Sequence, residues 1–261
     1  MIKRKPNRRP DAPSRSFRPS GGGGGAVWLY GRHPVEAALR NPERAILDLH
    51  LTPEAHKSLD IPLPVAPRIV TRADLDALLP SGAVHQGFAV RVGALEGPEV
   101  GDLPGLAEGL ERAVVVVLDQ VSDPHNVGAV LRSAAAFGAL AVVVQDRHSP
   151  EETGTLAKAA SGALEVVPLV RAVNLSRALE DLKSAGFWTV GLDGHADLNI
   201  GEADLPERAV LVLGAEGRGL RRLTAEACDL TVRLPMSDKV ESLNVSNAAA
   251  VALYEFARRR R

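Results

Sequence analysis

Residues 113–132 read AVVVVLDQVSDPHNVGAVLR, and this stretch decides the fold class of the chain. Its first six residues, Ala113–Leu118, form an unbroken apolar run rich in β-branched side chains. Such a run is typical of a strand that is covered on both faces of a parallel sheet. Asp123-Pro124 predicts a turn after the strand. A helix is then predicted over 127–137, with Asn126 as its N-terminal cap.

The pattern of a strand followed by a helix continues to the end of the chain. It predicts an α/β fold with a mostly parallel sheet and helices on both sides. Further strands are expected at Leu140–Gln145, Val166–Leu169, Trp188–Leu192, Ala209–Leu213 and Leu230–Leu234. Further helices are expected at Leu175–Ala185, Leu220–Ala227 and Val245–Arg259.

A smaller α/β pattern comes before this region. Residues 26–92 are expected to form a small domain, with helices near Pro34–Arg40 and Arg72–Leu79 and strands near Ile46–Leu51 and Phe88–Val92. Residues 93–112, which begin rich in Gly and Pro, predict a linker to a larger domain of residues 113–261. Residues 1–25 are rich in Pro, Arg, Ser and Gly and cannot bury enough apolar surface to fold, so they predict a disordered basic arm.

Charge is unevenly distributed, although the formal net charge of the 261 residues is only −1. Residues 1–25 carry seven Lys or Arg against one Asp, and the chain ends in Arg258–Arg261, so the body between these ends is acidic. Basic ends favour a polyanionic partner such as a nucleic acid, and solubilising tails are the other explanation.

Features of exported and membrane proteins are not recognisable. No apolar run reaches the roughly 18–20 residues of a membrane span, and no apolar leader is present. The single cysteine, Cys228, cannot form an internal disulfide. We therefore expect a soluble protein of the reducing cytoplasm, without a membrane partner.

Small polar residues and glycines gather at three places where a predicted strand ends, which is where ligands bind in open α/β sheets. The first is 119–132, in which Arg132 lies on the predicted helix among Ala, Val and Leu. The second is 214–219, whose glycines allow a ligand to approach the backbone closely. Its glycine order, G-x-x-G-x-G late in the chain, disfavours a nicotinamide dehydrogenase, which would open on G-x-G-x-x-G. The third is 234–247, where four small hydrogen-bonding side chains surround one helix start. Capping a helix requires only one such side chain.

These three clusters resemble, in order, the motifs of the SpoU/TrmH-class RNA 2′-O-ribose methyltransferases of the SPOUT superfamily. The matching residues are Asp119…Asp123-Pro-x-Asn-x-Gly-x-x-x-Arg132, Leu213-Gly-Ala-Glu-Gly and Leu234-Pro-Met…Ser-Leu-Asn-Val-Ser246. The similarity covers about residues 113–257. Residues 29–39 with His85-Gln-Gly-Phe88 resemble the small L30e-like substrate-binding domain of the subgroup that methylates a guanosine of 23S ribosomal RNA.

The resemblance implies a deep trefoil knot in the C-terminal domain, a homodimer with its active site near the interface, RNA as substrate and S-adenosylmethionine as cofactor. It implies catalytic roles for Arg132, Asn126, Glu216, Ser246 and Asn244. It implies cofactor contacts, largely through the backbone, at Gly214, Leu234 and Leu243. No metal is expected, because methyl transfer needs no Lewis acid and no closely spaced His and Cys ligands are present.

Arg132 is the residue on which the expected mechanism depends. The ribose 2′-oxygen must be held in line with the methyl group and must lose its proton. A guanidinium is hard to deprotonate. Arg132 is therefore expected to clamp a phosphate with its planar fork and to stabilise the developing alkoxide, while Asn126 and Glu216 hold Arg132 and the ribose.

Two other functions remain open. A tRNA 2′-O-methyltransferase would use the same chemistry, and the L30e-like domain favours ribosomal RNA over it. A catalytically silent RNA-binding assembly factor would keep the fold, and the intact polar residues of the motifs argue against it.

Overall fold

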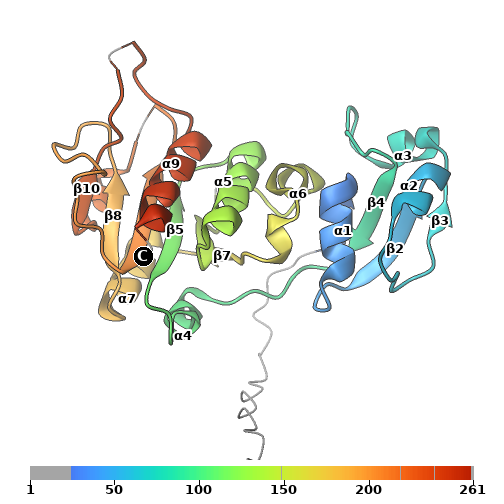
Figure 1. The fold of residues 1–261 in the computed structure, drawn as a ribbon, viewed down its shortest axis with the longest axis horizontal. Helices are drawn as coiled ribbons and strands as arrows, with labels where there is room; N and C mark the ends of the chain where they lie inside the picture. The colour runs from blue at the N-terminus through green and yellow to red at the C-terminus, as the bar shows by residue number, and fades with distance from the viewer. Residues whose placement is uncertain (1–24, 148, 218, 238, 260–261) are drawn as a thin grey trace, which may run out of the picture.

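The computed structural model describes residues 25–259 except residues 148, 218 and 238, and it contains two β-sheets with their helices (Figure 1). The smaller sheet comes from the N-terminal part of the chain and the larger one from residue 113 onward. The basic arm predicted over 1–25 lies outside the described residues apart from Gly25, as do the last two arginines.

The N-terminal sheet has four strands in the order β1-β4-β2-β3, of which only β2 and β3 pair in parallel. Its elements are β1 (Val27–Tyr30), α1 (Arg32–Arg40), β2 (Ile46–Leu51), α2 (Pro53–Ser58), β3 (Arg68–Ile69), α3 (Arg72–Leu78) and β4 (Phe88–Val92). The two predicted strands and two predicted helices of this region are confirmed to within two residues. β1, α2 and β3 are additional elements that the sequence pattern did not indicate.

The larger sheet has six parallel strands in the order β10-β8-β9-β5-β6-β7, which confirms the predicted α/β fold. Its strands are β5 (Ala113–Asp119), β6 (Ala141–Gln145), β7 (Leu169–Ala172), β8 (Trp188–Leu192), β9 (Arg208–Gly214) and β10 (Leu230–Val232). Its α-helices are α5 (Pro124–Phe137), α6 (Gly154–Ala160), α7 (Leu175–Ser184), α8 (Arg222–Glu226) and α9 (Val245–Arg258). A 3-10 turn, η2 (Ala163–Glu165), follows α6.

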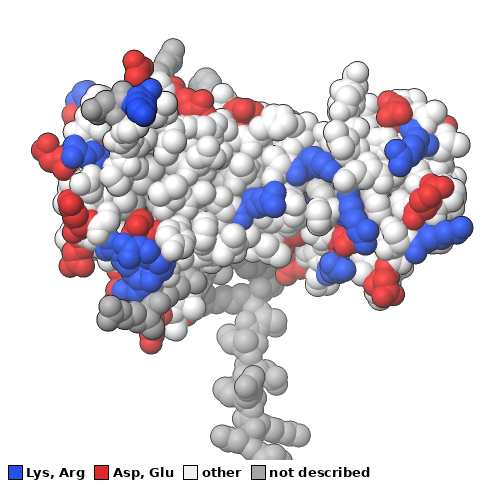
Figure 2. Space-filling model, turned by 45° about the horizontal axis from the view of Figure 1, so that its top comes forward, with Lys and Arg blue, Asp and Glu red and all other residues white. Residues whose placement is uncertain are grey.

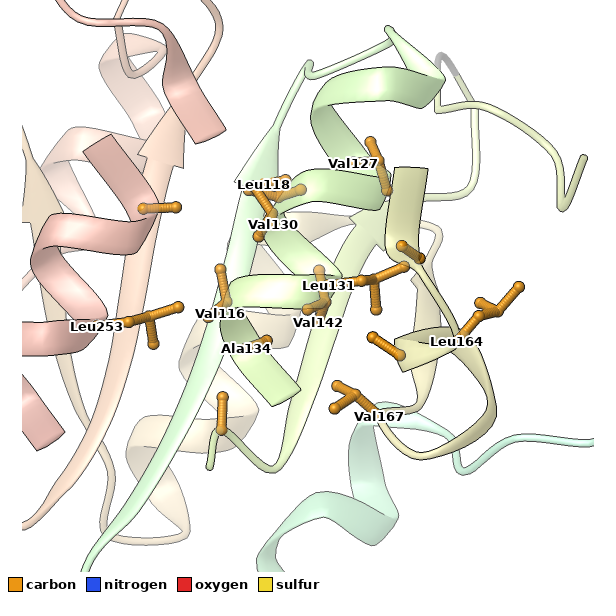
Figure 3. Close-up of a cluster of buried hydrophobic side chains, with 14 of the residues drawn as sticks. Val116, Leu118, Val127, Val130, Leu131, Ala134, Val142, Leu164, Val167 and Leu253 are labelled. Atoms are coloured by element: carbon orange, nitrogen blue, oxygen red, sulfur yellow. The ribbon is translucent and has the colours of Figure 1, made fainter. Parts of the chain in front are cut away.

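The central strand β5 is buried on both faces. Its even-numbered residues 114–118 join the core beneath α5, α6 and α9, and its odd-numbered residues join the core beneath α7. Figure 3 shows the first of these cores, with Val116 and Leu118 near Val130 of α5 and Leu253 of α9. Alternate side chains of a strand point to opposite faces, so two covered faces require an unbroken apolar run.

Four predicted boundaries are wrong. Helix α5 begins at Pro124 because Asp123, and not Asn126, caps it: Asp123 Oδ1 accepts from His125 N at 2.9 Å. The strand predicted over 166–169 starts only at its last residue, since η2 comes first. Helix α8 covers five of the eight predicted residues, because the backbone and side chain of Arg221 are held by Asp119. Strand β10 ends at Val232, two residues early.

The segment 93–112 is partly structured. It contains a 3-10 turn, η1 (Val100–Asp102), and a short helix, α4 (Leu103–Leu106). Leu103 and Ala107 are completely buried in the core beneath α7. The second half of this segment therefore packs on the larger sheet.

Arg44 joins the two halves of the molecule. Its guanidinium is fully buried, and it donates to both carboxylate oxygens of Glu165 at 2.7–3.1 Å and to the carbonyl oxygen of Gly93 at 2.9 Å. Asn41 Nδ2 donates to the same carboxylate at 2.8 Å. Because Glu165 belongs to η2, these bonds fix α1 and its following loop against the larger sheet.

Helix α6 provides a second junction, against β1. Gly154 lies so close to Tyr30 and Trp28 that a Cβ there would overlap both residues. Tyr30 Oη lies 3.2 Å from Thr155 Oγ1, and the apolar core continues from one sheet to the other without a break. Glycine at position 154 is needed for this close approach.

The described C-terminal arginines are engaged within the chain. Arg258 pairs with Glu255 at 2.7 Å, and Arg259 donates to the carbonyl oxygens of Ala203, Ile200 and Gly201 at 2.6–3.0 Å. These two arginines therefore make contacts within the chain, at the end of α9. None of the described helices is long and apolar enough to span a membrane.

Candidate active site

The candidate site lies where the carboxyl ends of β5 and β9 meet the start of α9. The two strands are neighbours, and Asp119 at the end of β5 is paired with Gly214 at the end of β9. The loops after these strands lead into α5 and towards α8. Motifs that lie far apart in the sequence therefore meet at one edge of the sheet.

Four of the five residues predicted as catalytic form one hydrogen-bonded cluster. Glu216 Oε1 accepts from Asn126 Nδ2 at 3.0 Å and from Asn244 Nδ2 at 2.7 Å. Asn244 Nδ2 also lies 2.9 Å from Asn126 Oδ1. Asn244 Oδ1 accepts from the backbone N–H and the hydroxyl of Ser246 at 2.9 and 2.5 Å. One residue from each of the first two motifs and two from the third thus come together.

Helix starts explain why these side chains converge. Asn126 lies in the first turn of α5, and Asn244 caps the 14-residue α9. Glu216 Oε1 is 3.4 Å from the backbone nitrogen of Val245, the first residue of α9. The carboxylate of Glu216 therefore lies at a helix N-terminus and accepts from two side-chain amides. Glu216 and Asn244 remain exposed, so the cluster can offer amide and hydroxyl groups to a ligand.

Arg132 is not part of this cluster. It lies six residues after Asn126 on α5, which is about 9 Å along the helix axis and on another face. Its exposed side chain lines an open groove together with Ser161 and Val166. Among the described residues it has no hydrogen-bond or ion-pair partner. The predicted contact of Asn126 and Glu216 with Arg132 is therefore not made within this chain.

The three residues predicted to contact the cofactor lie around the same edge. Gly214 ends β9, Leu234 is buried and Leu243 is 37% exposed. A Cβ on Gly214 would overlap the backbone of Gly219 and Leu220, so the loop crosses tightly over the strand end. Glycines at 217 and 219 have positive φ, and the residues from 235 to 244 that are described are exposed. Loop backbone and exposed apolar side chains fit a ligand with adenine and methionine parts.

Sequence reasoning missed the role of the pair Asp119 and Arg221. The carboxylate of Asp119 is completely buried, and Arg221 Nε and Nη2 both lie 2.7 Å from its Oδ1. The backbone nitrogen of Arg221 also donates to Asp119 Oδ2 at 3.2 Å. This pair anchors the end of the loop that carries Glu216. An aspartate that directly ends a buried strand was the available signal, because a buried carboxylate needs a partner.

Two family models match the chain. Residues 113–254 match the model described as SpoU rRNA Methylase family. Residues 28–98 match the model described as RNA 2′-O ribose methyltransferase substrate binding.

Similar proteins span nearly the same length. The 23S rRNA (guanosine-2′-O-)-methyltransferase RlmB of Salmonella typhi is 42% identical over 240 residues, which covers 89% of this chain and 98% of that protein. Among solved structures, the SpoU methyltransferase AviRb from Streptomyces viridochromogenes, in complex with the cofactor AdoMet, has a TM-score of 0.74 at 24% identity and covers 90% of this chain and 91% of its own. The crystal structure of an RNA 2′-O ribose methyltransferase has a TM-score of 0.74 at 26% identity, and the match covers 90% of this chain and 89% of that one.

Proposed function

The chain belongs to the SpoU rRNA methylase family, and we propose that it transfers a methyl group from S-adenosylmethionine to the ribose 2′-hydroxyl of a guanosine in 23S ribosomal RNA. The cluster of Asn126, Glu216 and Asn244 is the observation that carries the chemistry, because three motifs meet there with exposed polar groups. The substrate is supported by the 42% identical relative of nearly equal length, which is a 23S rRNA guanosine methyltransferase.

The residues of the cluster have positioning roles in this reaction. When bound, S-adenosylmethionine supplies the electrophilic methyl group. Asn126 and Asn244 orient the ribose, and Glu216 holds both amides in place. Ser246 orients Asn244 through its Oδ1. Backbone groups at Gly214, Leu234 and Leu243 would hold the cofactor.

Arg132 clamps the phosphate of the target nucleotide and stabilises the developing charge on the 2′-oxygen. The 2′-hydroxyl proton passes to a phosphate oxygen or to water, because a guanidinium keeps its own protons. Lysine could supply the charge but not the planar fork. The Arg132 side chain is exposed and has no hydrogen-bond or ion-pair partner within the part of the chain that the structure describes, which supports a role towards an anionic ligand.

A homodimer is part of the same proposal. Arg132 is separated from its own cluster along α5, so a second copy close to this site would complete it. Helix α9 begins at the site and, further along, exposes Val251 and Tyr254, at 45% and 53%; such an apolar face suits a subunit contact. Sedimentation equilibrium should give twice the chain mass of 27.6 kDa. A monomer that is fully active at the same concentration would exclude the dimer.

The proposed function also assigns a role to each region of the chain. We assign residues 1–25 as an RNA-binding basic arm, 26–92 as the L30e-like substrate-binding domain, 93–112 as a linker whose second half packs on the larger sheet, and 113–261 as the methyltransferase domain. The tight crossing at Gly214 supports the trefoil knot expected of the family. A cytoplasmic location follows from the proposed ribosomal substrate.

Mass mapping of ribose methylation tests the function directly. 23S rRNA and tRNA would be compared from cells with and without the gene, and from deletion cells that express Arg132→Ala or Arg132→Lys. We expect one guanosine methyl group of 23S rRNA to be lost and to be restored by the wild-type gene only. In vitro, both variants should turn over at least roughly 100-fold more slowly.

Cofactor affinity and melting temperature serve as controls, and neither should change in the Arg132 variants. A methyl group missing from tRNA instead would keep the chemistry and overturn the ribosomal substrate. No missing methyl group, together with no binding of S-adenosylmethionine, would favour the silent assembly factor. A lysine variant with normal turnover would contradict the clamp.

A further inference from the structure

We propose that the open groove between α1 and α5 holds the phosphodiester backbone of the RNA strand next to the target ribose, with Arg40 and His33 as phosphate contacts. This rests on the proposed function, and it assigns a role to a surface outside the hydrogen-bonded cluster. The groove connects the helix of the N-terminal sheet with the helix that carries Arg132. It therefore leads a bound strand from one half of the molecule to the other.

The groove has a volume of about 340 Å³, with two walls and a floor. His33 and Arg40 project from α1, Arg132 projects from α5, and the turn between α6 and η2 forms the floor. Its size lies within the range of about 300–1,000 Å³ that is common for small-molecule sites. Because it is open to solvent, it can accept a segment of a chain as well as a single nucleotide.

The charge of the groove is positive, in contrast to the acidic body of the chain. Two guanidinium groups, those of Arg40 and Arg132, face one carboxylate, that of Glu36. Glu36 is shared between Arg32 at 2.7 Å and Arg40 at 3.7 Å, and the Arg40 side chain is 61% exposed. Figure 2 shows Lys and Arg side chains on both sides of the junction between the two halves of the molecule. Arginine forks on an exposed surface match phosphate oxygens, so the charge favours a nucleic-acid backbone.

The floor of the groove is built from small residues. Residues 160–163 are Ala, Ser, Gly and Ala, and Ser161 and Gly162 both have positive φ, at 53° and 93°. A Cβ on Gly162 would lie 2.9 Å from the Cβ of Ala37, so a larger residue there would push α1 away. A positive φ is uncommon for a residue other than glycine, and Ser161 adopts one. Such backbone conformations are found preferentially at functional sites. The turn keeps α1 close and leaves the floor free of bulky side chains.

The rim of the groove offers an apolar contact. Val166 lines the groove and is 71% exposed, which is unusual for a valine that follows a buried turn. An exposed apolar side chain beside two arginines suits a ribose or base edge next to a phosphate. The combination is expected of a surface that binds RNA mainly through its backbone.

Arg40→Ala tests the groove, with Arg222→Ala as its matched control. Both arginines form an ion pair with a glutamate one helical turn away. Arg40 lies 3.7 Å from Glu36, and Arg222 lies 2.7 Å from Glu226. Arg222 is 77% exposed and lies on α8, which packs with α7 on the other face of the sheet. Unmodified 23S rRNA transcribed in vitro is the probe. Arg40→Ala should weaken RNA binding and raise KM about tenfold, with kcat and S-adenosylmethionine affinity unchanged.

Two further measurements distinguish a loss of RNA binding from a loss of protein stability: the salt dependence of binding, and the removal of a negative charge from the groove. Arg40→Ala should reduce the slope of log K against log salt by about 0.7 for the lost phosphate contact. Glu36→Gln removes the carboxylate of the groove and should tighten RNA binding about two- to fivefold. A general loss of structure cannot tighten binding, so this variant distinguishes the two explanations.

Each outcome decides the inference. Wild-type KM and salt slope in Arg40→Ala, equal losses in Arg40→Ala and Arg222→Ala, or weaker binding by Glu36→Gln would each overturn it. A wild-type protein that binds the transcript but methylates no ribosomal or transfer RNA would overturn the proposed function instead, so the two failures are distinguishable.

Discussion

Gly214→Ala tests whether the loop after β9 is held by direct backbone contact. An added Cβ would overlap the carbonyl group of Gly219 and the nitrogen of Leu220. A Cβ in a protein is essentially never closer than 3.0 Å to a heavy atom outside its own residue and the two chain neighbours. The overlapping atoms are backbone, so no side chain can swing away. The loop must move by about 1 Å or more, and such overpacking costs about 1–3 kcal/mol of stability.

The effect on stability and on cofactor binding can be measured separately. For a folding unit of this size, that cost lowers the melting temperature by about 2–12 °C. The same loop carries Glu216, and a misplacement of about 1 Å can lower turnover roughly 100-fold. Scanning calorimetry would measure the first effect. Titration calorimetry with S-adenosylmethionine and single-turnover methylation would measure the second.

Gly201→Ala is the matched control. No atom lies within 4 Å of a Cβ at this position, and φ is not in the left-handed region. Alanine there should leave stability unchanged or raise it by up to about 1 kcal/mol, because the unfolded chain loses freedom. Wild-type melting and cofactor affinity in Gly214→Ala would refute the tight crossing. Equal damage from both variants would point to a general loss of glycine flexibility.

The buried ion cluster between the two halves gives the remaining predictions. Arg44→Met leaves the carboxylates of Glu165 and Glu152 without their guanidinium and should cost about 3–5 kcal/mol in urea unfolding, against about 0–1 kcal/mol for the exposed Arg68→Met. Equal costs would show that burial of this pair is unimportant. Burial raises the pKa of Glu152 above its ordinary 4.5, and the neighbouring carboxylate of Glu165 adds to this effect, although the Arg44 guanidinium 2.7 Å from Glu152 Oε1 acts to lower the pKa. The folded chain then holds this proton more tightly than the unfolded chain, so the stability contributed by Glu152 is complete below pH 4.5 and falls as pH rises through the raised pKa. Glu152→Gln should therefore be more favourable relative to wild type at pH 7 than at pH 4, and unfolding free energies that differ equally at both pH values would contradict this.

Much of the fold and part of the site could be predicted because their signals are local. The apolar run of β5, the strand-and-helix alternation and the start of α9 follow from side-chain periodicity and helix-start residues within a few positions. Polar and glycine clusters at strand ends predicted where the site lies. The motif resemblance added which residues to expect there, and four of the five catalytic candidates do meet in one cluster.

Only the tertiary structure decided how distant residues share their partners. The Asn126 side chain donates to Glu216, 90 positions away, and Asp123 caps α5 instead. Arg44 and Glu165, 121 positions apart, join the two halves, and neither residue type indicates its partner from the sequence. The groove that Arg132 lines forms only where α5, α1 and the turn after α6 come together. Packing and the burial of charge determine which distant residues become partners. Both act between segments that are brought together in space, and neither leaves a periodic pattern in the sequence.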